Sequence, residues 1–325
     1  MRVSVPLYSY LKTFIGSLVL LASLLGGHDV ALAVDKEAFI GDFVYANDFY
    51  RGFIYNRMDH EGKLIPGKEA WIFFEMDLRD IGRPFTDGEL RDRGAFFAKL
   101  KRHADDKGIK IVFFIAPSTP SIYPEYLPES MKIRSPSASD QLSRYLTDNS
   151  VIDVVYPKEA LLKEKGKYKL YYKTDAHWTE IGAFFGVEEL MKRTGKWFPN
   201  SALRSIDDYR IVTKRNFGVT LAKRLGLASY YLEDRIFLKP KFAVKDRSVL
   251  PKALVIHDSY YDYAQDLLKE NFNVTEKELK YEGKVSYDEK RTLNEIIDEM
   301  DKIKPKIVIL LFCERGYERL FDRRG

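Results

Sequence analysis

Residues 252–259 read Lys-Ala-Leu-Val-Ile-His-Asp-Ser, a short apolar run that stops at three polar side chains. Two further runs of this kind are Ile-Lys-Ile-Val-Phe-Phe-Ile-Ala at 109–116 and Lys-Ile-Val-Ile-Leu-Leu-Phe at 306–312. Nearly continuous apolar runs of this length are typical of strands that are buried on both faces of a parallel sheet. Helical patterns separate the runs, for example at about 87–107 and 260–271. The alternation therefore predicts an α/β fold with a mostly parallel sheet and helices on both faces.

Several less regular stretches surround these runs. Residues 151–156 and 168–172 are predicted to be strands, because both are rich in β-branched or aromatic side chains. Thr179 is expected to cap a helix, and Gly195 to end that helix in the left-handed conformation. The stretch at about 199–247 lacks a clear period and is interpreted as an insertion or a lid.

The N-terminus has the pattern of an export signal. Basic residues flank an apolar run at 14–25, which is followed by Ala31-Leu32-Ala33, a small-x-small cleavage site. The uncharged stretch is about 15 residues long, short of the roughly 20 that a membrane-spanning helix needs. We therefore predict a signal peptide at 1–33, with an uncleaved anchor to the inner membrane as the alternative, and a single domain at 34–325. The expected location is the periplasm or another extracytoplasmic space.

Composition excludes several classes of protein. The 325 residues are 45% apolar and 31% charged, which is enough apolar sequence for a sizeable core. The 53 basic and 48 acidic residues give a net charge of only +5, spread along the chain, so no nucleic-acid partner is indicated. Cys313 is the single cysteine, which excludes an internal disulfide and a thiolate metal cluster.

Ser259 is the first candidate for chemistry. It follows an apolar strand and precedes an amphipathic helix, the place where ligands bind in open α/β sheets. Its hydroxyl would be exposed in the turn, with backbone N–H groups nearby that could bind an oxyanion. Serine is also a good helix cap, so position alone leaves a purely structural role open.

The second candidate is the segment Thr-Asp-Ala-His-Trp at 174–178. On extended backbone Asp175 and His177 point to the same face, where the carboxylate could orient the imidazole and leave its other nitrogen free to accept a proton. A metal site that combines these two residues with His257 and Asp258 is the alternative, although the usual ligand spacing on a helix is missing. We expect no metal ion and no other cofactor.

Together, several segments resemble the alginate O-acetyltransferase proteins of the AlgJ/AlgX type, which carry an SGNH-hydrolase-like domain. The two specific segments are Tyr-Pro-Glu-Tyr-Leu-Pro at 123–128 and Thr-Asp-Ala-His-Trp at 174–178. The weaker ones are residues 67–74, 115–117, 256–260 and 305–309, the last of which leads to Glu314-Arg315. The resemblance covers about residues 65–320 and implies a three-layer α/β/α fold of the SGNH-hydrolase type.

The resemblance also implies roles for individual residues. Ser259 would be the nucleophile, His177 the general base and Asp175 its orienting acid. Arg315 would contact the oxyanion or the substrate, unless it forms a surface ion pair with Glu314. The aromatic neighbours of the triad, Trp178 and Tyr260, would stack against sugar rings or pack in the core. The chain departs from the family at His257, where a small residue is common, and this departure puts the donor specificity in doubt.

The implied activity is transfer of acetyl groups through an acetyl-serine to hydroxyls of a secreted or cell-surface polysaccharide, for which alginate is the best-known example. Because acetyl-coenzyme A is absent outside the cell, the resemblance further implies a membrane-bound O-acyltransferase partner that delivers acetyl groups. Two alternatives remain open at this point. One is a secreted carbohydrate acetylesterase, which would use water as the acceptor, and the other is a non-catalytic scaffold for polysaccharide assembly.

Overall fold

The computed structural model describes residues 64–133, 135–199, 204–217, 220–224, 232–243, 246–279 and 289–321. The predicted leader at 1–33 lies outside these residues, and its boundary with the rest of the chain stays a prediction. Within the described ranges, no helix is both long and apolar enough to cross a membrane.

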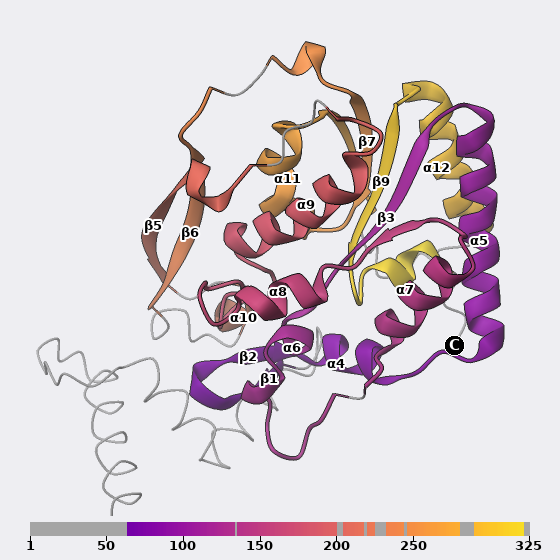
Figure 1. Ribbon diagram of the computed structural model, residues 1–325. Helices are drawn as coiled ribbons and strands as arrows, with labels where there is room; N and C mark the ends of the chain where they lie inside the picture. Colours follow the sequence, from indigo (N-terminus) through magenta and orange to yellow (C-terminus); the bar gives the residue numbers. More distant parts are fainter. Residues whose placement is uncertain are drawn as a thin grey trace, which may run out of the picture.

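A five-stranded parallel sheet forms the centre of the molecule (Figure 1). Its strand order is β4-β3-β9-β7-β8, and every neighbouring pair is parallel. The strands are β3 (Lys110–Ala116), β4 (Asp153–Val155), β7 (Lys252–His257), β8 (Asn273–Glu278) and β9 (Ile307–Cys313). The predicted mostly parallel sheet is thereby confirmed, and its three apolar runs form the three inner strands.

Helices cover both faces of the sheet, as the apolar strands require (Figure 1). Successive side chains of a strand point to opposite faces, so Val112 and Phe114 join one core cluster while Ile111 and Phe113 join the other. The first cluster lies under α8 (Lys158–Glu164), α9 (Glu180–Thr194) and α11 (Tyr261–Lys269). The second lies under α5 (Asp87–Asp106), α7 (Ala138–Asp148) and α12 (Glu289–Ile303). The predicted three-layer α/β/α architecture is confirmed.

Shorter elements surround these layers. Two antiparallel pairs lie outside the central sheet, β1 (Leu64–Pro66) with β2 (Ile72–Phe74) and β5 (Tyr209–Phe217) with β6 (Leu232–Pro240). The short α-helices are α4 (Glu75–Gly82), α6 (Thr119–Ile122) and α10 (Thr220–Arg224). Single 3-10 turns are η1 (Lys68–Ala70), η2 (Pro124–Tyr126), η3 (Ile206–Asp208), η4 (Arg247–Val249) and η5 (Tyr317–Leu320). The stretch interpreted as an insertion thus contains the β5–β6 hairpin and α10.

Two local predictions are wrong. Residues 168–172 are not a strand, because Tyr171 makes only an isolated bridge, to Trp178. The aromatic side chains of this segment serve the core instead, and the hydroxyl of Tyr171 donates to the carbonyl of Pro117 at 2.5 Å. Gly195 is right-handed, with φ −55°, because its N–H continues the helical pattern by donating to the carbonyl of Met191.

The start of α9 is packed tightly against the preceding chain. Thr179 caps the helix as predicted, since its hydroxyl accepts the N–H of Gly182 at 3.2 Å and lies 2.8 Å from the carbonyl oxygen of Lys169. A Cβ atom on Gly182 would lie 2.2 Å from the carbonyl oxygen of Leu170. Only glycine therefore lets the helix start directly behind the loop that carries Asp175 and His177.

We predict that Gly182→Ala lowers the free energy of unfolding by roughly 1–3 kcal/mol, because the methyl group must push two backbone segments apart. Gly88→Ala is the matched control, since Gly88 also lies in the first turn of a helix but its Cβ would have no neighbour closer than 3.8 Å. Urea denaturation of both variants measures the effect. Equal stability of the two variants would contradict the packing argument.

Candidate active site

Asp175, His177 and Ser259 lie in one hydrogen-bonded line. The Nδ1 atom of His177 is 2.7 Å from Oδ1 of Asp175, and its Nε2 atom is 2.8 Å from Oγ of Ser259. Asp175 and His177 lie on the loop before α9, and Ser259 lies in the turn between β7 and α11. The Asp175 side chain is 3% exposed and that of His177 is 16% exposed, so the acid is shielded while the imidazole reaches the surface.

Hydrogen bonds from His177 and Thr220 favour the ionised form of the Asp175 carboxylate. Burial acts to raise its pKa, but the hydrogen bonds and charge of His177, together with the hydroxyl of Thr220, lower the pKa below its ordinary value. The Thr220 hydroxyl donates to Oδ2 of Asp175 at 3.2 Å, from the first residue of α10. An ionised carboxylate on Nδ1 favours a proton there and leaves Nε2 free to accept the proton of Ser259.

The β5–β6 hairpin supports the same loop through a buried carboxylate. Glu233, near the start of β6, accepts the N–H groups of Lys173 and Thr174 at 2.6 and 3.1 Å, and the Thr174 hydroxyl at 2.6 Å. It also forms an ion pair of 2.8 Å with Lys169. The hairpin therefore holds the residues that immediately precede Asp175.

A second buried carboxylate shapes the turn of Ser259. Asp258 accepts the N–H of Tyr260 at 3.0 Å through Oδ1 and the N–H of Cys313 at 2.9 Å through Oδ2. A Cβ atom on Gly316 would lie 1.9 Å from Oδ2, so a glycine is needed beside this carboxylate. Because the Tyr260 N–H is occupied, it is not free to bind an oxyanion. The N–H of Ser259 has no acceptor in the part of the chain that the structure describes.

Aromatic rings enclose the imidazole of His177. Its centroid lies 5.0 Å from that of Tyr260 and 5.4 Å from that of Tyr263, which is stacked at 28°. Tyr260 and Trp178 are fully buried, and the indole N–H of Trp178 donates to the carbonyl of Tyr260 at 3.0 Å. The expectation that these two rings stack on sugars does not match their burial, because neither presents a face to solvent. The part-exposed Tyr263 was not among the expected site residues.

Arg315 is an internal ion-pair partner rather than a surface one. Its Nη1 atom donates to the carboxylate of Asp77, which is completely buried, and its own side chain is 13% exposed. Burial acts to lower the pKa of Arg315, but the charge of Asp77 raises that pKa well above its usual value. The guanidinium lies 5.9 Å from the ring of Tyr260. The alternative of a surface pair with Glu314 is wrong.

Glu314 instead forms the centre of a separate buried cluster. Its Oε2 accepts the N–H of Ser118 and the hydroxyl of Ser121, and its Oε1 accepts the hydroxyl of Tyr156, each at 2.6 Å. Burial raises the pKa of Glu314 above its ordinary value, although the three hydrogen bonds act in the opposite direction. The cluster ties the ends of β3, β4 and β9 together next to the Asp77–Arg315 pair.

His257 packs against the turn of Ser259 without facing the triad. Its Nδ1 atom is 2.8 Å from the carbonyl oxygen of Asp258, and its ring stacks on Tyr261 with centroids 4.1 Å apart. Among the described residues, no group of three or more His, Cys, Asp and Glu side chains could hold a metal ion. His257 thus stabilises the turn of Ser259 through these two contacts and is not part of the hydrogen-bonded line.

Sequence reasoning missed the residues that hold the triad in place. The sequence predicts a role for Asp258 only as an alternative metal ligand, and it predicts none for Thr220, Glu233 or Asp77. Asp258 could have been recognised from its position next to the nucleophile candidate. Thr220 and Glu233 come from the stretch without a period, where no pattern shows which side chains fold back on the site.

We predict that Glu314→Gln becomes more stable relative to the unsubstituted protein as the pH rises above 4.5, the ordinary pKa of glutamate. A raised folded-state pKa favours the neutral group, so the stability that Glu314 contributes is complete at low pH and is lost as the pH passes its folded-state pKa. Glutamine keeps the acceptor for the two serines and can donate to Tyr156. Urea denaturation at several pH values measures the difference.

The control is Asp140→Asn, for which the expected change of stability with pH has the opposite sign. Burial acts to raise the pKa of Asp140, but the hydrogen bonds of Lys158 and Ser137 lower it overall. Neutralising this carboxylate should therefore cost stability at neutral pH and cost little at low pH. If the difference in stability between Glu314→Gln and the unsubstituted protein did not change with pH, the raised pKa of Glu314 would be contradicted.

Comparisons with known proteins agree with this fold. A family model described as "SGNH hydrolase-like domain, acetyltransferase AlgX" matches residues 64–228. The probable alginate O-acetylase AlgJ of Pseudomonas fluorescens is 23% identical over 141 residues, which are 42% of this chain and 35% of the relative. The aligned part of the chain thus spans about a third of that curated relative.

Two solved structures have the same fold. The O-acetyltransferase domain of Pseudomonas putida AlgJ superposes with a TM-score of 0.57 at 14% identity, covering 81% of this chain and 95% of that one. Bacillus cereus PatB1, in a structure with a sulfonyl adduct, superposes with a TM-score of 0.58 at 12% identity, covering 81% and 100%. At these identities the likeness shows the fold alone. The family match extends over half of the chain, and the protein belongs to the family of SGNH hydrolase-like acetyltransferase domains of the AlgX type.

Proposed function

We propose that the protein is an exported O-acetyltransferase that moves acetyl groups onto hydroxyls of a secreted or cell-surface polysaccharide. The observation that carries the proposal is the line of two short hydrogen bonds from Asp175 through His177 to Ser259. Such a line is the arrangement that activates a serine hydroxyl for attack on an acyl group. The family match supports acetyl as the group that is transferred.

In the first step, Nε2 of His177 takes the proton of Ser259 while Oγ forms a bond to the acetyl carbon of the donor. The tetrahedral intermediate then collapses, its bond to the leaving group breaks, and the imidazolium returns the proton to that group. Asp175 stays ionised throughout and stabilises the positive charge on the imidazole. The products are an acetyl-serine and the free leaving group.

In the second step, a sugar hydroxyl gives its proton to Nε2 of His177 and attacks the acetyl carbon. The bond to Oγ of Ser259 breaks, Oγ takes the proton back, and the O-acetyl ester leaves. The Ser259 N–H is the first proposed donor to the oxyanion in both steps. Arg315 is proposed as the second donor or as a substrate contact, since its guanidinium follows β9 and lies near the ring of Tyr260.

A polysaccharide is proposed as the acceptor because the curated relative is described as acting on one. AlgJ of Pseudomonas fluorescens is named a probable alginate O-acetylase, which makes an alginate-like chain the first acceptor to test. The triad itself does not distinguish a sugar hydroxyl from water, because both attack the same acetyl-serine. Experiment must therefore separate transfer from hydrolysis.

We predict that the protein from residue 34 onward, given p-nitrophenyl acetate, gains one acetyl group on Ser259 and passes it to a deacetylated polysaccharide. Intact-protein and glycan mass spectrometry measures both species. Ser259→Ala should abolish the adduct, and Asp175→Asn should slow its formation by about 10³- to 10⁴-fold, because the imidazole then adopts the wrong tautomer. Ser248→Ala, at an exposed serine in the η4 turn before β7, is the matched control.

The alternatives give different results in this experiment. Acetate release to water at the same rate with and without the glycan would identify an esterase. Transfer that persists in Ser259→Ala would exclude Ser259 as the nucleophile. No adduct and no transfer, with the unsubstituted protein behaving like Ser259→Ala, would favour a scaffold. For Arg315, replacement by lysine should slow formation of the acetyl-serine while the affinity for the glycan stays unchanged, if its role is at the oxyanion.

We further propose that the protein works outside the cytoplasm and receives acetyl groups from a membrane-bound O-acyltransferase. The predicted leader at 1–33 supports the location, and the lack of acetyl-coenzyme A outside the cell supports the partner. Fractionation of cells that express the full chain should place it outside the cytoplasm. Deleting the partner should abolish polysaccharide acetylation while leaving the purified protein active on p-nitrophenyl acetate. Normal acetylation in the deletion strain would refute the partner.

A further inference from the structure

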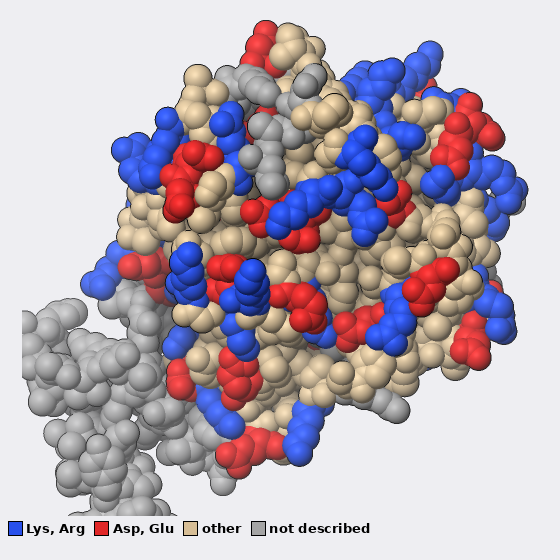
Figure 2. Space-filling view, viewed as in Figure 1, with Lys and Arg blue, Asp and Glu red and all other residues tan. Residues whose placement is uncertain are grey.

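A pocket of about 540 Å³ lies at the outer edge of the sheet, away from the triad. Strand β4 is the last strand on this side, and helices α7 and α9 flank it. Figure 2 shows basic side chains gathered above a tan hollow on this face. The lining residues are Ser143, Thr147, Val154, Val155, Tyr156, Pro157, Glu189, Lys192, Arg193 and Lys196. Neither the triad nor its supporting carboxylates belong to this set.

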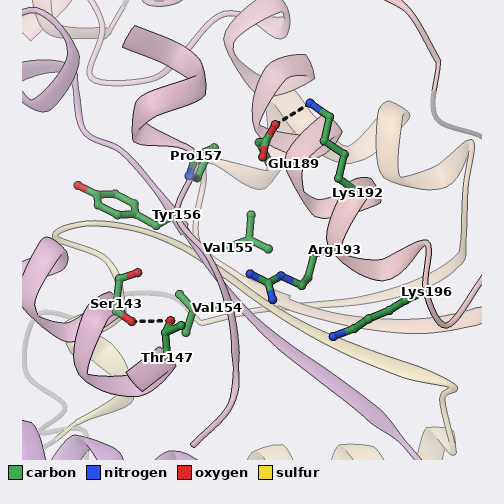
Figure 3. Close-up of a pocket in the computed structure, with 10 residues that line it drawn as sticks. All are labelled: Ser143, Thr147, Val154, Val155, Tyr156, Pro157, Glu189, Lys192, Arg193 and Lys196. Carbon is green, nitrogen blue, oxygen red and sulfur yellow. Dashed lines mark hydrogen bonds and ion pairs between the residues drawn. The ribbon is translucent and has the colours of Figure 1, made fainter. Parts of the chain in front are cut away.

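The floor of the pocket is apolar and its rim is polar. Val154, Val155 and Pro157 supply the apolar surface, as the close-up in Figure 3 shows. On the α7 side, the Thr147 hydroxyl donates to the backbone carbonyl of Ser143, and the Ser143 hydroxyl bonds to none of the residues that the structure describes. A small apolar floor with hydroxyl and charged groups at its rim is the usual lining of a site for a polar organic ligand.

The carboxylates near the rim are shared unevenly among its cations. Lys192 contacts two of them, Glu188 and Glu189, at 3.0 and 2.7 Å. Arg193 and Lys196, in contrast, share the single carboxylate of Asp153, at 3.5 and 3.0 Å.

The side chains of Arg193 and Lys196 are 44% and 51% exposed, and Figure 3 shows both charged ends directed toward the pocket. Three cations and three carboxylates balance over the whole rim, so the positive charge is local: it lies on the side where Arg193 and Lys196 share the one carboxylate of Asp153. The complementary group on that ligand is a carboxylate, which a guanidinium binds through paired hydrogen bonds.

We propose that this pocket binds a carboxylated sugar unit and so holds an acidic polysaccharide at a distance from the triad. Arg193 and Lys196 contact the carboxylate, Glu189 and Ser143 bond ring hydroxyls, and the sugar C–H face lies on Val155. This inference rests on the proposed function, because it further specifies that the acceptor polysaccharide is acidic. An acidic peptide fits less well, because β4 has only three residues to pair with a strand and the rim also carries the acceptor Glu189.

The position of the pocket gives it a function distinct from catalysis. Helix α9 begins directly after the loop of His177 and carries Arg193 in its last turn. At 1.5 Å per residue, the two ends of this helix are about 20 Å apart. A sugar bound here cannot reach Ser259, so the site increases the affinity for long chains and leaves the chemical step unchanged.

The test measures binding in the Ser259→Ala background, where no turnover occurs. The probe is a polygalacturonate oligosaccharide, compared by calorimetry with the same oligosaccharide after its carboxyl groups have been reduced to alcohols. Arg193→Ala/Lys196→Ala should raise the dissociation constant for the acidic probe about tenfold or more, and the neutral probe should bind weakly to every form. Arg291→Ala/Lys302→Ala is the matched control on α12, which removes two exposed, ion-paired cations from a helix that does not line the pocket.

Activity separates this inference from the proposed function. With the nucleophile intact, the pocket variant should form the acetyl-serine from p-nitrophenyl acetate at the normal rate and should lose transfer to long acidic chains through a higher KM. Equal binding of the acidic and neutral probes, tighter binding of polyglutamate, or an unchanged dissociation constant in the pocket variant would overturn the inference and leave the triad untouched. Loss of the acetyl-serine only in Ser259→Ala would still support the proposed function.

Discussion

The carboxylate of Asp258 connects two of the three inner strands of the sheet, β7 and β9, at the end where the site lies. One of its oxygens accepts the N–H of Tyr260 in the nucleophile turn, and the other accepts the N–H of Cys313 at the end of β9. Both donors are buried, and a buried N–H without an acceptor is costly. The position of Ser259 therefore depends on the sheet being complete, because the turn is fixed to a strand that follows it by more than fifty residues in sequence.

Other buried carboxylates fix the chain around the site in the same way. Glu233 fixes the loop of Asp175, Glu314 fixes the ends of three strands, and Asp77 pairs with Arg315. Each of these carboxylates is almost fully buried and accepts at least one hydrogen bond from a backbone N–H group, a hydroxyl or a cation. Buried charges that are hydrogen-bonded in this way hold a defined geometry, because any displacement leaves a charged group unpaired. Rigid support of this kind is what a proton relay between two side chains requires.

The sheet and the side chains of Asp175, His177 and Ser259 could be predicted from the sequence, because burial leaves a visible pattern in it. The inner strands are buried on both faces and so must be apolar throughout, which makes them visible as uninterrupted runs. The triad residues lie at the ends of such runs or directly before a capped helix. In contrast, residues 168–172 have the composition of a strand, but their tyrosines bond to distant backbone groups, and no strand in the described ranges pairs with them. Contacts made across the fold, such as that of Thr220, leave no local pattern.

The β5–β6 hairpin and α10 have a consequence for protein engineering. Surface hairpins are the segments that designers most readily shorten or exchange to open an active site to larger substrates. Here such a replacement would also remove Glu233 and Thr220, which hold the loop and the carboxylate of Asp175. A shortened variant would lose the contacts that position Asp175 beside His177, even if larger molecules entered more easily. Remodelling of this protein should therefore introduce new loops elsewhere, or retain those two side chains.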